Sequence, residues 1–423
     1  MRYGSRGFIK SLNQYYDNSA YYLNDVLKAE TNLKDMITMA DGNIYVIPRY
    51  QKILQNELGY RMWIYKPWLE KLNLSEPKTL DEFYNVLKAF KEKDPNGNGL
   101  ADEIPFIGAT SGGENWFCDF IAAAFQPIDI QSNYLYPENG KIKAAYVEPE
   151  YKEALKYLNK LCTEGLLSPS SFTSDGEQTR QTIQNPSGVQ VGCFTSMAPT
   201  YLINATDRAE GYDILAPLTQ DNGTGYAVYG ASIPTNSFFI TKNCQYPEAA
   251  FRLGDIMMSE EMSIWNRFGK KGTDWVEPEE GDHGMFESMG YKAKIKPILA
   301  WGSPQNSHWQ QGAPAYRGYE LACATVDSGS NIYETRIAEH LQSYLDKKPK
   351  EYITKIIYTE DEINAINEIQ QNITSYRKDS VARFIIGDWD IESGWEDYLK
   401  EMKAIGVDEM LDIVQKAYDR CNK

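Results

Sequence analysis

Histidine is scarce in this sequence, and the motifs that build most hydrolytic and nucleotide-binding sites are absent. The 423 residues contain three histidines, His283, His308 and His340. The sequence has no HExxH segment, no GxSxG nucleophile elbow and no Walker phosphate-binding loop. These absences disfavour zinc peptidases, serine hydrolases of the α/β class and P-loop ATPases.

Cysteine is also infrequent, and its spacing excludes the common structural zinc sites. The six cysteines stand at positions 118, 162, 193, 244, 323 and 421. No two of them form a CxxC pair, which zinc ribbons and thioredoxin-like redox sites require. Because they are widely scattered in a chain of this length, we predict six free thiols, most of them buried.

Long apolar segments are missing as well. Residues 1–10 contain no apolar core of a secretory signal peptide, and no run of 18 apolar residues occurs anywhere. The sequence therefore predicts neither a signal peptide nor a transmembrane helix in this chain.

Positive charge is in deficit. Lys and Arg number 43 against 59 Asp and Glu, so the formal net charge is -16. Such a chain repels phosphate backbones and anionic membrane surfaces, which disfavours nucleic-acid binding. Solubility alone accounts for an acidic balance of this size, so the charge by itself identifies no partner.

Aromatic side chains, in contrast, are abundant. The chain contains 30 Tyr and nine Trp, and aromatics make up 13% of the sequence. Flat rings with a polar tip suit sugar recognition, because apolar sugar faces stack on them while hydroxyls need donors and acceptors. For any single ring the alternative is packing in a core, which is the commoner role.

The order of elements predicts an α/β protein with mostly parallel sheets, since strands alternate with helices. A chain of 423 residues also suggests two or three domains. Predicted strands are 45–48, 62–65, 104–107 and 238–240; predicted helices are 79–93, 149–164, 247–258 and a helical C-terminal stretch. Thr79 with Glu82, and Thr359 with Glu362, form capping boxes. Residues 269–318 are rich in Gly and Pro and predict long loops.

The motif with the most specific spacing is the loop of residues 94–103, DPNGNGLADE. Oxygen-bearing side chains stand at alternate positions and Gly99 permits a sharp turn, which is the ligand order of an EF-hand-like calcium loop. Pro105 stands where that loop has its bidentate Glu, so Glu103 has to close the shell. The predicted ligands are Asp94, Asn96, Asn98, the carbonyl of Leu100, Asp102 and Glu103. The alternative is an Asx-rich turn without metal.

Paired carboxylates of a glycoside hydrolase leave no fixed spacing in a sequence, so that class stays open. Glu114 is the best single candidate, because it lies in a loop beside Trp116. Its alternative roles are a hydrogen-bond acceptor for sugar hydroxyls and a solvated loop charge.

Several short motifs follow one another along the chain. They are Trp63-Ile64, Trp68–Leu72, Pro77–Phe83, Leu87–Phe90, the loop at 94–103 with Ile104-Pro105, Tyr246–Ala250, Phe268-Gly269 with Gly272, and the terminal Trp395, Tyr398, Gly406 and Ala417–Arg420. In this order they resemble extracellular solute-binding protein family 1, the sugar-binding lipoproteins of bacterial ABC importers. The resemblance covers essentially the whole chain, and the loop at 94–103 looks like the calcium site of alginate-binding members.

The resemblance implies a two-lobed, periplasmic-binding-protein-like fold of type 2 with hinge crossings and a helical C-terminal region. It places residues 1–49 and 237–300 in a first lobe that lacks its N-terminal part. Residues 50–236 and 301–423 then form the second lobe, including the calcium loop and the C-terminal helices. Because the family opens with a lipoprotein signal and a βαβ portion, the chain is expected to start inside the first lobe, which should expose a sheet edge.

The function implied is to bind a carbohydrate, most simply an oligosaccharide, and to deliver it to an ABC importer by hinge closure. The expected partners are the sugar and the importer's membrane subunits, with no nucleic acid, and the protein is expected to be a monomer. It is expected on the extracellular face of the membrane, lipid-anchored in its full-length form, with a structural calcium ion and no catalytic residues. The alternatives are a glycoside-active enzyme and a scaffold or adhesion protein of the same fold.

The resemblance also suggests which residues meet the sugar. It places chain crossings near 48–62, 232–238 and 276–310, and it puts Glu114, Asn115 and Trp116 in the cleft. Tyr50, Trp275, Trp301 and Trp309 are the further predicted cleft residues. Trp63 and Trp68 flank a strand and a helix start, and Trp389 and Trp395 lie among terminal helices, so these four are predicted to be packing residues.

Overall fold

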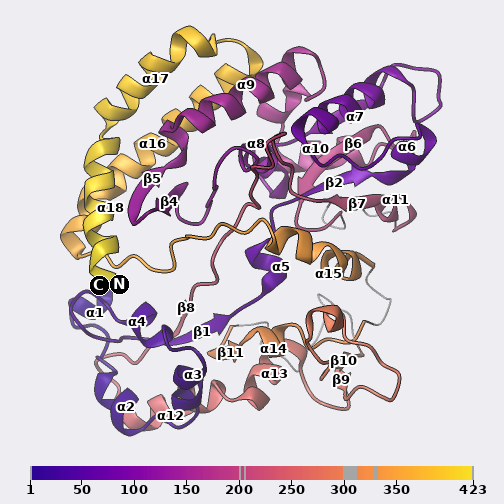
Figure 1. Ribbon diagram of the computed structural model, residues 1–423. Helices are drawn as coiled ribbons and strands as arrows, with labels where there is room; N and C mark the ends of the chain where they lie inside the picture. Colours follow the sequence, from indigo (N-terminus) through magenta and orange to yellow (C-terminus); the bar gives the residue numbers. More distant parts are fainter. Residues whose placement is uncertain (1, 200–201, 204–205, 299–311, 328–331, 422–423) are drawn as a thin grey trace.

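The computed structural model describes residues 2–199, 202–203, 206–298, 312–327 and 332–421. In Figure 1 the described elements form two lobes, one below the other, which several chain segments connect. Each lobe is built around its own mixed sheet with helices packed on it. The predicted α/β class and two-lobed architecture are thereby confirmed.

The first lobe, at the bottom of Figure 1, has a three-stranded sheet of order β11-β1-β8. Its elements are α1 (Arg2–Ser5), α2 (Asn13–Asn18), α3 (Tyr22–Ala29), α4 (Leu33–Ile37), β1 (Ile47–Gln51), β8 (Thr235–Phe238), α12 (Pro247–Met257), α13 (Glu260–Phe268), β9 (Trp275–Val276), β10 (Lys296–Pro297), β11 (Ala315–Arg317) and α14 (Tyr319–Ala322). β1 runs parallel to β11 and antiparallel to β8. β8 is an edge strand whose Thr235 and Asn236 are exposed.

The second lobe, at the top of Figure 1, has a four-stranded sheet of order β3-β6-β2-β7. Its elements are α5 (Leu54–Glu57), β2 (Arg61–Tyr65), α6 (Lys66–Lys71), α7 (Leu80–Glu92), β3 (Ile104–Ile107), α8 (Phe117–Ala122), β4 (Leu135–Glu138), β5 (Lys141–Ala144), α9 (Pro149–Thr163), α10 (Gly176–Ile183), β6 (Val191–Ser196), α11 (Thr206–Glu210), β7 (Tyr212–Leu215) and α15 (Ile332–Leu345). Trp63 and Trp68 lie in its core, as predicted.

Three long helices complete the second lobe and run along one side of it in Figure 1. They are α16 (Glu360–Ile386), α17 (Ile391–Ile405) and α18 (Val407–Cys421). α16 packs against α9, α17 and α18, and its apolar stripe buries Ile366, Ile373 and Phe384. Trp395 is buried between these helices, and Trp389 packs edge-on against the Phe384 ring, so both have the predicted packing role.

Local sequence explains why α7 begins where it does. The Thr79 hydroxyl accepts from the Glu82 backbone N–H at 3.2 Å, and the Glu82 carboxylate accepts from the Thr79 N–H at 3.2 Å. This reciprocal pair satisfies two backbone donors that a helix start leaves free. One face of the helix then buries Phe83, Leu87 and Phe90 against the second-lobe sheet. The predicted helix and capping box are confirmed, as is the capping box at Thr359.

The prediction of mostly parallel sheets was wrong. β3 runs parallel to β6, but the central strand β2 runs antiparallel to both β6 and β7. β2 enters this sheet directly from the first lobe through α5. The connection from the first lobe therefore sets the direction of β2, whereas a βαβ crossover within the sheet would have made β2 parallel to its neighbours.

The third crossing also lies later than predicted. Residues 276–298 stay in the first lobe, since Ile295 bridges to Thr325 and Gly284 bridges to Val326. β11, predicted in the second lobe, pairs with β1. The chain reaches the second lobe between Val326 and α15, which packs against α5 and β7. The backbone hydrogen bonds of this irregular segment are made within the first lobe, which keeps the segment there. The other predicted lobe boundaries remain predictions.

All six thiols are free, and Cys162, Cys193 and Cys323 are buried. No helix in the described part of the chain is both long enough and apolar enough to cross a membrane.

An ion pair joins α15, the helix that follows the third crossing, to the second-lobe sheet and makes stability depend on pH. His340 of α15 lies 3.3 Å from the Asp213 carboxylate of β7. The hydrogen bond to Asp213 raises the pKa of His340 above its usual 6.5. Burial alone would raise the pKa of Asp213, but the hydrogen bond and charge of His340 lower it below 3.8.

We therefore predict that His340→Gln costs about 1 kcal/mol of unfolding free energy near pH 6 and much less at pH 9. A raised histidine pKa stabilises fully below the unfolded value and loses its effect as the pH rises through the folded one. Urea unfolding at the two pH values measures this, with the exposed His283→Gln as control. An equal cost at both pH values contradicts the prediction.

Candidate functional site

Two of the segments that connect the lobes meet the first-lobe helix α14 at one buried carboxylate, Glu57. It ends α5 on the first crossing and is 3% exposed. The Tyr319 hydroxyl, just after β11, donates to it at 2.9 and 3.1 Å. The Tyr229 hydroxyl, on the segment between β7 and β8, donates at 3.4 Å, and the Gly230 N–H donates to the Glu57 carbonyl at 3.0 Å. Glu57 thus joins the first crossing to the second crossing and to α14 of the first lobe.

Further aromatic and basic groups surround this carboxylate. The rings of Tyr229 and Tyr352 lie edge to face with centroids 4.8 Å apart, and Lys348 sits 4.3 and 4.4 Å from their centres. Burial, and then the charge of Glu57, raise the pKa of Tyr229 and of Tyr319 well above 10. Both hydroxyls therefore stay protonated at neutral pH and remain hydrogen-bond donors.

The second lobe presents the predicted aromatic residue Trp116 beside this junction. Gly112 has a φ of 79°, which turns the chain after β3 into a 3₁₀ helix, Gly113–Trp116. Trp116 is half-buried and lies edge to face on Tyr60, with ring centroids 4.5 Å apart. Tyr60 belongs to the first crossing, immediately before β2. Asn115 is exposed, and Glu114 lies in the same 3₁₀ helix.

The first lobe contributes a cavity of about 780 Å³ between α3 and the chain from α13 to α14. Four tyrosines line it together with charged residues: Tyr22, Tyr291, Tyr316, Tyr319, Asp25, Glu30, Lys52, Glu260, Lys294 and Glu320. Lys52 pairs with Glu30 at 3.1 Å and lies 4.5 Å from the Tyr319 ring centre, while the Tyr316 hydroxyl donates to Glu30 at 2.8 Å. The cavity therefore presents aromatic faces and oriented polar groups together.

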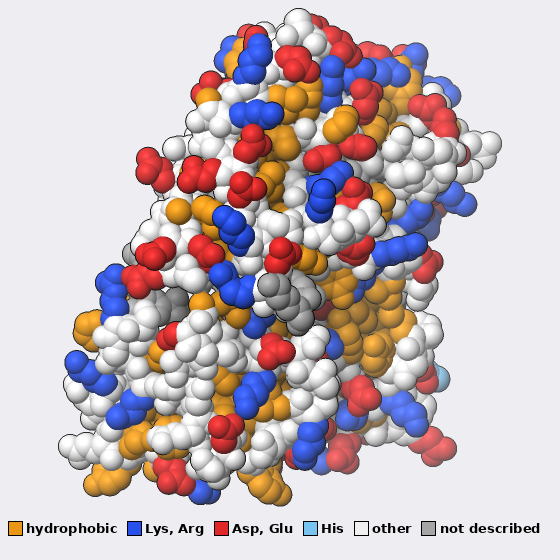
Figure 2. All heavy atoms as spheres, turned by 60° about the vertical axis from the view of Figure 1, so that its left-hand side comes forward, with side chains coloured by type: hydrophobic (Ala, Val, Ile, Leu, Met, Phe, Trp, Pro, Cys, Tyr) orange, Lys and Arg blue, Asp and Glu red, His pale blue; other side chains and the backbone are white. Residues whose placement is uncertain are grey.

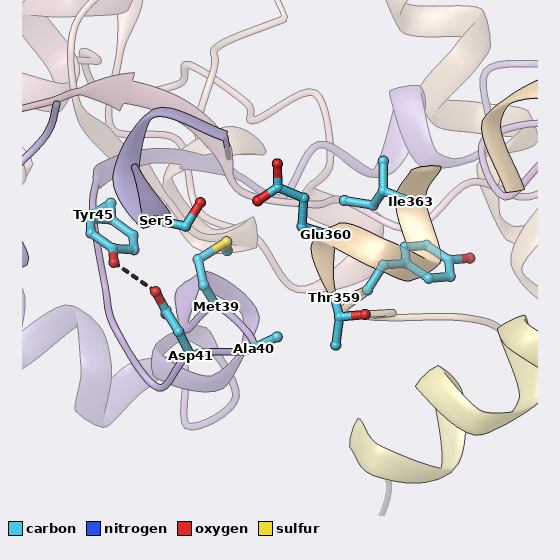
Figure 3. A pocket seen from close by; sticks show the side chains of 9 residues that line it. Ser5, Met39, Ala40, Asp41, Tyr45, Thr359, Glu360 and Ile363 are labelled. Atoms are coloured by element: carbon cyan, nitrogen blue, oxygen red, sulfur yellow. Dashed lines mark hydrogen bonds between the residues drawn. The ribbon is translucent and has the colours of Figure 1, made fainter. Parts of the chain in front are cut away.

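A second cavity, of about 290 Å³, lies where the first lobe meets the start of α16 (Figure 3). Met39, Ala40 and Tyr45 face it from the first lobe, and Ile363 faces it from α16. Its exposed surface is mostly apolar, although Ser5, Asp41, Thr359 and Glu360 also line it. Because residues of both lobes line it, we interpret it as a contact zone between the lobes. Figure 2 also shows hydrophobic side chains gathered about midway between the lobes on one face.

The predicted cleft residues do not all share one environment. Tyr50 is 6% exposed and packs in the first-lobe core, with its ring 6.4 Å from that of Tyr316. Trp275 is buried in a separate small core with Phe268, and its indole N–H donates to the Gly269 carbonyl at 3.1 Å. Trp301 and Trp309 lie outside the described residues. Of the predicted aromatic residues that are described, Trp116 alone is half-exposed.

The loop at 94–103 forms a series of side-chain-to-backbone hydrogen bonds, a pattern shared by calcium loops and Asx-rich turns. Asp94 Oδ1 accepts from the Gly97 and Asn98 N–H groups at 2.9 and 3.1 Å, and Oδ2 accepts from Gly99 at 3.0 Å. Asn98 Oδ1 accepts from the Leu100 N–H at 2.7 Å, and Gly99 has a φ of 77°. The loop is thus wound around the Asp94 carboxylate, as the first ligand of a calcium loop requires.

The other predicted ligands do not converge fully. Asp102 accepts from the side-chain amides of Asn96, Asn98 and Gln190, at 2.8, 3.1 and 2.5 Å. Glu103 Oε2 is buried without a partner, and burial raises the pKa of this carboxyl. No group of three His, Cys, Asp or Glu side chains in the described ranges has metal-binding spacing. Even so, the orphaned Glu103 oxygen and the all-oxygen donor set fit a calcium ion.

The junction residues Glu57, Tyr60, Tyr229 and Tyr319 were not identified from the sequence, nor was Tyr316 of the first-lobe cavity. Glu57 looks like a solvated helix charge in a sequence, and burial is decided by segments far along the chain. The segment Tyr316-Arg317-Gly318-Tyr319 carried the one usable indication, because tyrosines beside a glycine in an otherwise loop-rich region are typical of ligand surfaces.

The sequence profile of the bacterial extracellular solute-binding proteins matches residues 5–263. The chain belongs to this family. It is similar to the fructooligosaccharide ABC transporter substrate-binding protein FusA of Streptococcus pneumoniae, with 26% identity over 432 aligned residues that cover 99% of this chain and 77% of FusA. It is also similar to lipoprotein LipO of Bacillus subtilis, with 27% identity over 437 residues that cover 98% of this chain and 79% of LipO.

Solved structures agree with this family assignment at the level of the fold. An extracellular solute-binding protein from Bifidobacterium longum subsp. infantis superposes with a TM-score of 0.83 at 22% identity, over 99% of this chain and 84% of its own. An EF-hand mutant of S. pneumoniae FusA in complex with fructo-nystose superposes with a TM-score of 0.74 at 23% identity, over 100% of this chain and 86% of its own. The periplasmic-binding-protein-like fold is therefore established.

Membership of the solute-binding protein family confirms two of the predictions. The protein is a solute-binding component of an ABC transporter, and it is not an enzyme, because the family supplies transport components. The extracellular class of the family agrees with the predicted side of the membrane.

The junction at Glu57 gives a direct prediction. Glu57→Gln replaces an acceptor-only carboxylate by an amide that cannot accept from both tyrosines equally well. We expect it to cost about 1–3 kcal/mol of unfolding free energy, the range for unsatisfied buried polar groups. Urea unfolding measures this, with the exposed Glu177→Gln on α10 as control. An unchanged stability contradicts the role given to Glu57.

Proposed function

We propose that this solute-binding protein takes up an oligosaccharide between its two lobes and delivers it to an ABC importer when the lobes close. The observation that carries the proposal is the first-lobe cavity, with its four tyrosines and its oriented Lys52–Glu30 pair, next to Glu57, where the lobes are connected. Its volume of about 780 Å³ falls in the usual range for small-molecule sites.

Both lobes contribute groups of the kind that sugars need. On the second lobe, the half-exposed Trp116 is supported from the side by Tyr60, so its ring is held without being covered. On the first lobe, Lys52 and Tyr319 lie at the end of the cavity nearest the crossings. Hinge closure then brings a stacking surface over polar groups, and the wrong sugar leaves some of them unpaired.

These relatives support the ligand class without identifying the sugar. FusA is a fructooligosaccharide-binding component, and its EF-hand mutant was solved with fructo-nystose. The identity of 26% is too low to transfer a particular sugar, its linkage or its length. We further propose a monomer that is lipid-anchored at the extracellular face in its full-length form, as the name of LipO suggests for that relative.

A structural calcium ion in the loop at 94–103 is part of the proposal. Asp94, Asn96, Asn98, the Leu100 carbonyl, Asp102 and Glu103 would hold it, which gives the buried Glu103 oxygen a partner. The ion would fix the chain between the end of α7 and the start of β3. It would therefore stabilise the second lobe without contacting the sugar.

The first test of this proposal is Trp116→Ala. Loss of a central aromatic contact is expected to weaken oligosaccharide binding by about 2–4 kcal/mol, with a small change in melting temperature, because the ring is not in the core. Calorimetric titration with the glycan that most raises the melting temperature in a panel of fructan, xylan and pectin oligosaccharides measures it.

Trp275→Ala is the matched control, since this ring is buried in a small core. It should cost about 3–5 kcal/mol of stability and leave sugar affinity unchanged. Unchanged affinity in Trp116→Ala removes Trp116 from the site. Absence of binding to every glycan in the panel contradicts the proposed function and favours a scaffold role.

The second test concerns calcium. Calcium at about 100 times its dissociation constant should stabilise the native state by about 2.7 kcal/mol, so a chelator should lower the melting temperature by several degrees. Asp94→Ala should abolish this difference, whereas Asp221→Ala, in another exposed turn, should retain it. A melting curve that a chelator does not move in the wild type counts against the ion.

A further inference from the structure

Hydrogen-bond donors without partners gather where two parallel strands end. Gln51 is the last residue of β1 and Arg317 the last of β11, and the two stand opposite each other in the ladder. Residues in register on neighbouring strands point to the same face of a sheet. The Gln51 side-chain nitrogen Nε2 and the Arg317 nitrogens Nε and Nη1 are all buried without a hydrogen-bond partner.

Arg317 is a buried cation without a counter-ion. It is 3% exposed, and it forms no ion pair within the residues that the structure describes. The guanidinium carbons of Arg317 and of a second cation, Arg267, lie 5.7 and 5.2 Å from the centre of the same Phe268 ring. Burial, and then the like charge of Arg267, lower the pKa of Arg317 to about 9, so it still carries its charge at neutral pH.

An arrangement of this kind is unfavourable unless something negative completes it. Buried charges in proteins are normally paired, and an unpaired one persists mainly where a ligand or a partner supplies the opposite charge. The missing counter-ion does not reflect a shortage of carboxylates, because the chain has 59 Asp and Glu and a net charge of -16. Arg61, another buried arginine without an ion pair among the described residues, donates to the Met197 and Gln55 carbonyls, whereas Arg317 Nε and Nη1 have no partner.

The position of Arg317 is one that ligands use. Open α/β sheets bind ligands beyond the carboxyl ends of their strands. Immediately after these two ends come Lys52, whose backbone N–H donates to the Arg317 carbonyl at 2.8 Å, and Tyr319, which binds Glu57. Gln51 and Arg317 thus stand one residue before Lys52 and Gly318, which line the first-lobe cavity.

We propose that Arg317, with Arg267 and Gln51 beside it, binds the carboxylate of an acidic sugar residue, so that the oligosaccharide taken up by this protein contains uronic acid. The inference rests on the proposed oligosaccharide binding and adds the chemical class of the sugar. A carboxylate accepts charge-assisted hydrogen bonds from the Arg317 and Gln51 side chains, and a neutral hydroxymethyl group at the same place cannot replace these bonds. The charge then selects the ligand and the aromatic rings hold its faces.

The test compares ligands that differ only in this group. Trisaccharides of galacturonate, mannuronate and glucuronate are titrated calorimetrically alongside their counterparts with carboxyl groups reduced to alcohols. At least one acidic trisaccharide should bind roughly tenfold or more tightly than its reduced form, the effect of a charged hydrogen bond. Acetate and free galacturonate, which supply the carboxylate without the chain of sugars, should each bind at least about tenfold more weakly than that trisaccharide.

Variants of Arg317 test whether this residue causes the preference for the acidic trisaccharide. Arg317→Met should remove the preference for the acidic form while leaving affinity for the reduced form within about twofold, and Arg317→Lys should keep part of the preference. Because Arg317→Met removes an unpaired buried charge, its melting temperature should not fall. Arg252→Gln, which removes an exposed arginine of α12, is the control for net charge and should behave as the wild type.

Each outcome decides a separate point. Equal affinity for acidic and reduced forms, or an acid preference that survives in Arg317→Met, overturns the inference and leaves the proposed function standing. Acetate that binds as tightly as the trisaccharide overturns the assignment to a sugar. If neither these trisaccharides nor the neutral trisaccharide kestose binds, the proposed function fails and the inference fails with it.

Discussion

The carboxylate of Glu57 is the constraint on which the arrangement of the two lobes depends. A carboxyl group that is 3% exposed has to have its oxygens satisfied by the protein, and here the donors come from chain segments far apart in the sequence. Tyr319 follows the strand β11, and Tyr229 precedes β8, while Glu57 itself precedes β2. Satisfying one carboxylate therefore fixes the first two crossings relative to each other and to α14 of the first lobe.

This junction also explains why binding groups collect beside it. Lys52 follows β1, Tyr319 follows β11 and Tyr60 precedes β2, so the three residues lie next to strand ends near the junction. Each is held by a protein contact: Lys52 by Glu30, Tyr60 by Trp116 and Tyr319 by Glu57. Groups that are oriented before the ligand arrives lose less entropy when it binds, which favours affinity without further contacts.

Local features were predictable from the sequence, and long-range ones were not. The helix α7 and the strand β3 follow from a capping box and a short apolar run, which neighbouring residues alone determine. Tyr50 and Trp275 were predicted in the cleft but lie in cores, because an aromatic residue near a crossing has the same pattern whether its ring points in or out. The direction of β2 and the late third crossing depend on pairing with distant strands, which no local pattern encodes.

The central claim is that one ligand contacts both lobes next to the Glu57 junction. Hydrogen–deuterium exchange tests it most directly, with and without a saturating oligosaccharide chosen by its effect on the melting temperature. The account predicts slower exchange in residues 113–121 of the second lobe and, at the same time, in residues 315–322 of the first. Protection confined to one lobe, or absent from both segments, would contradict it.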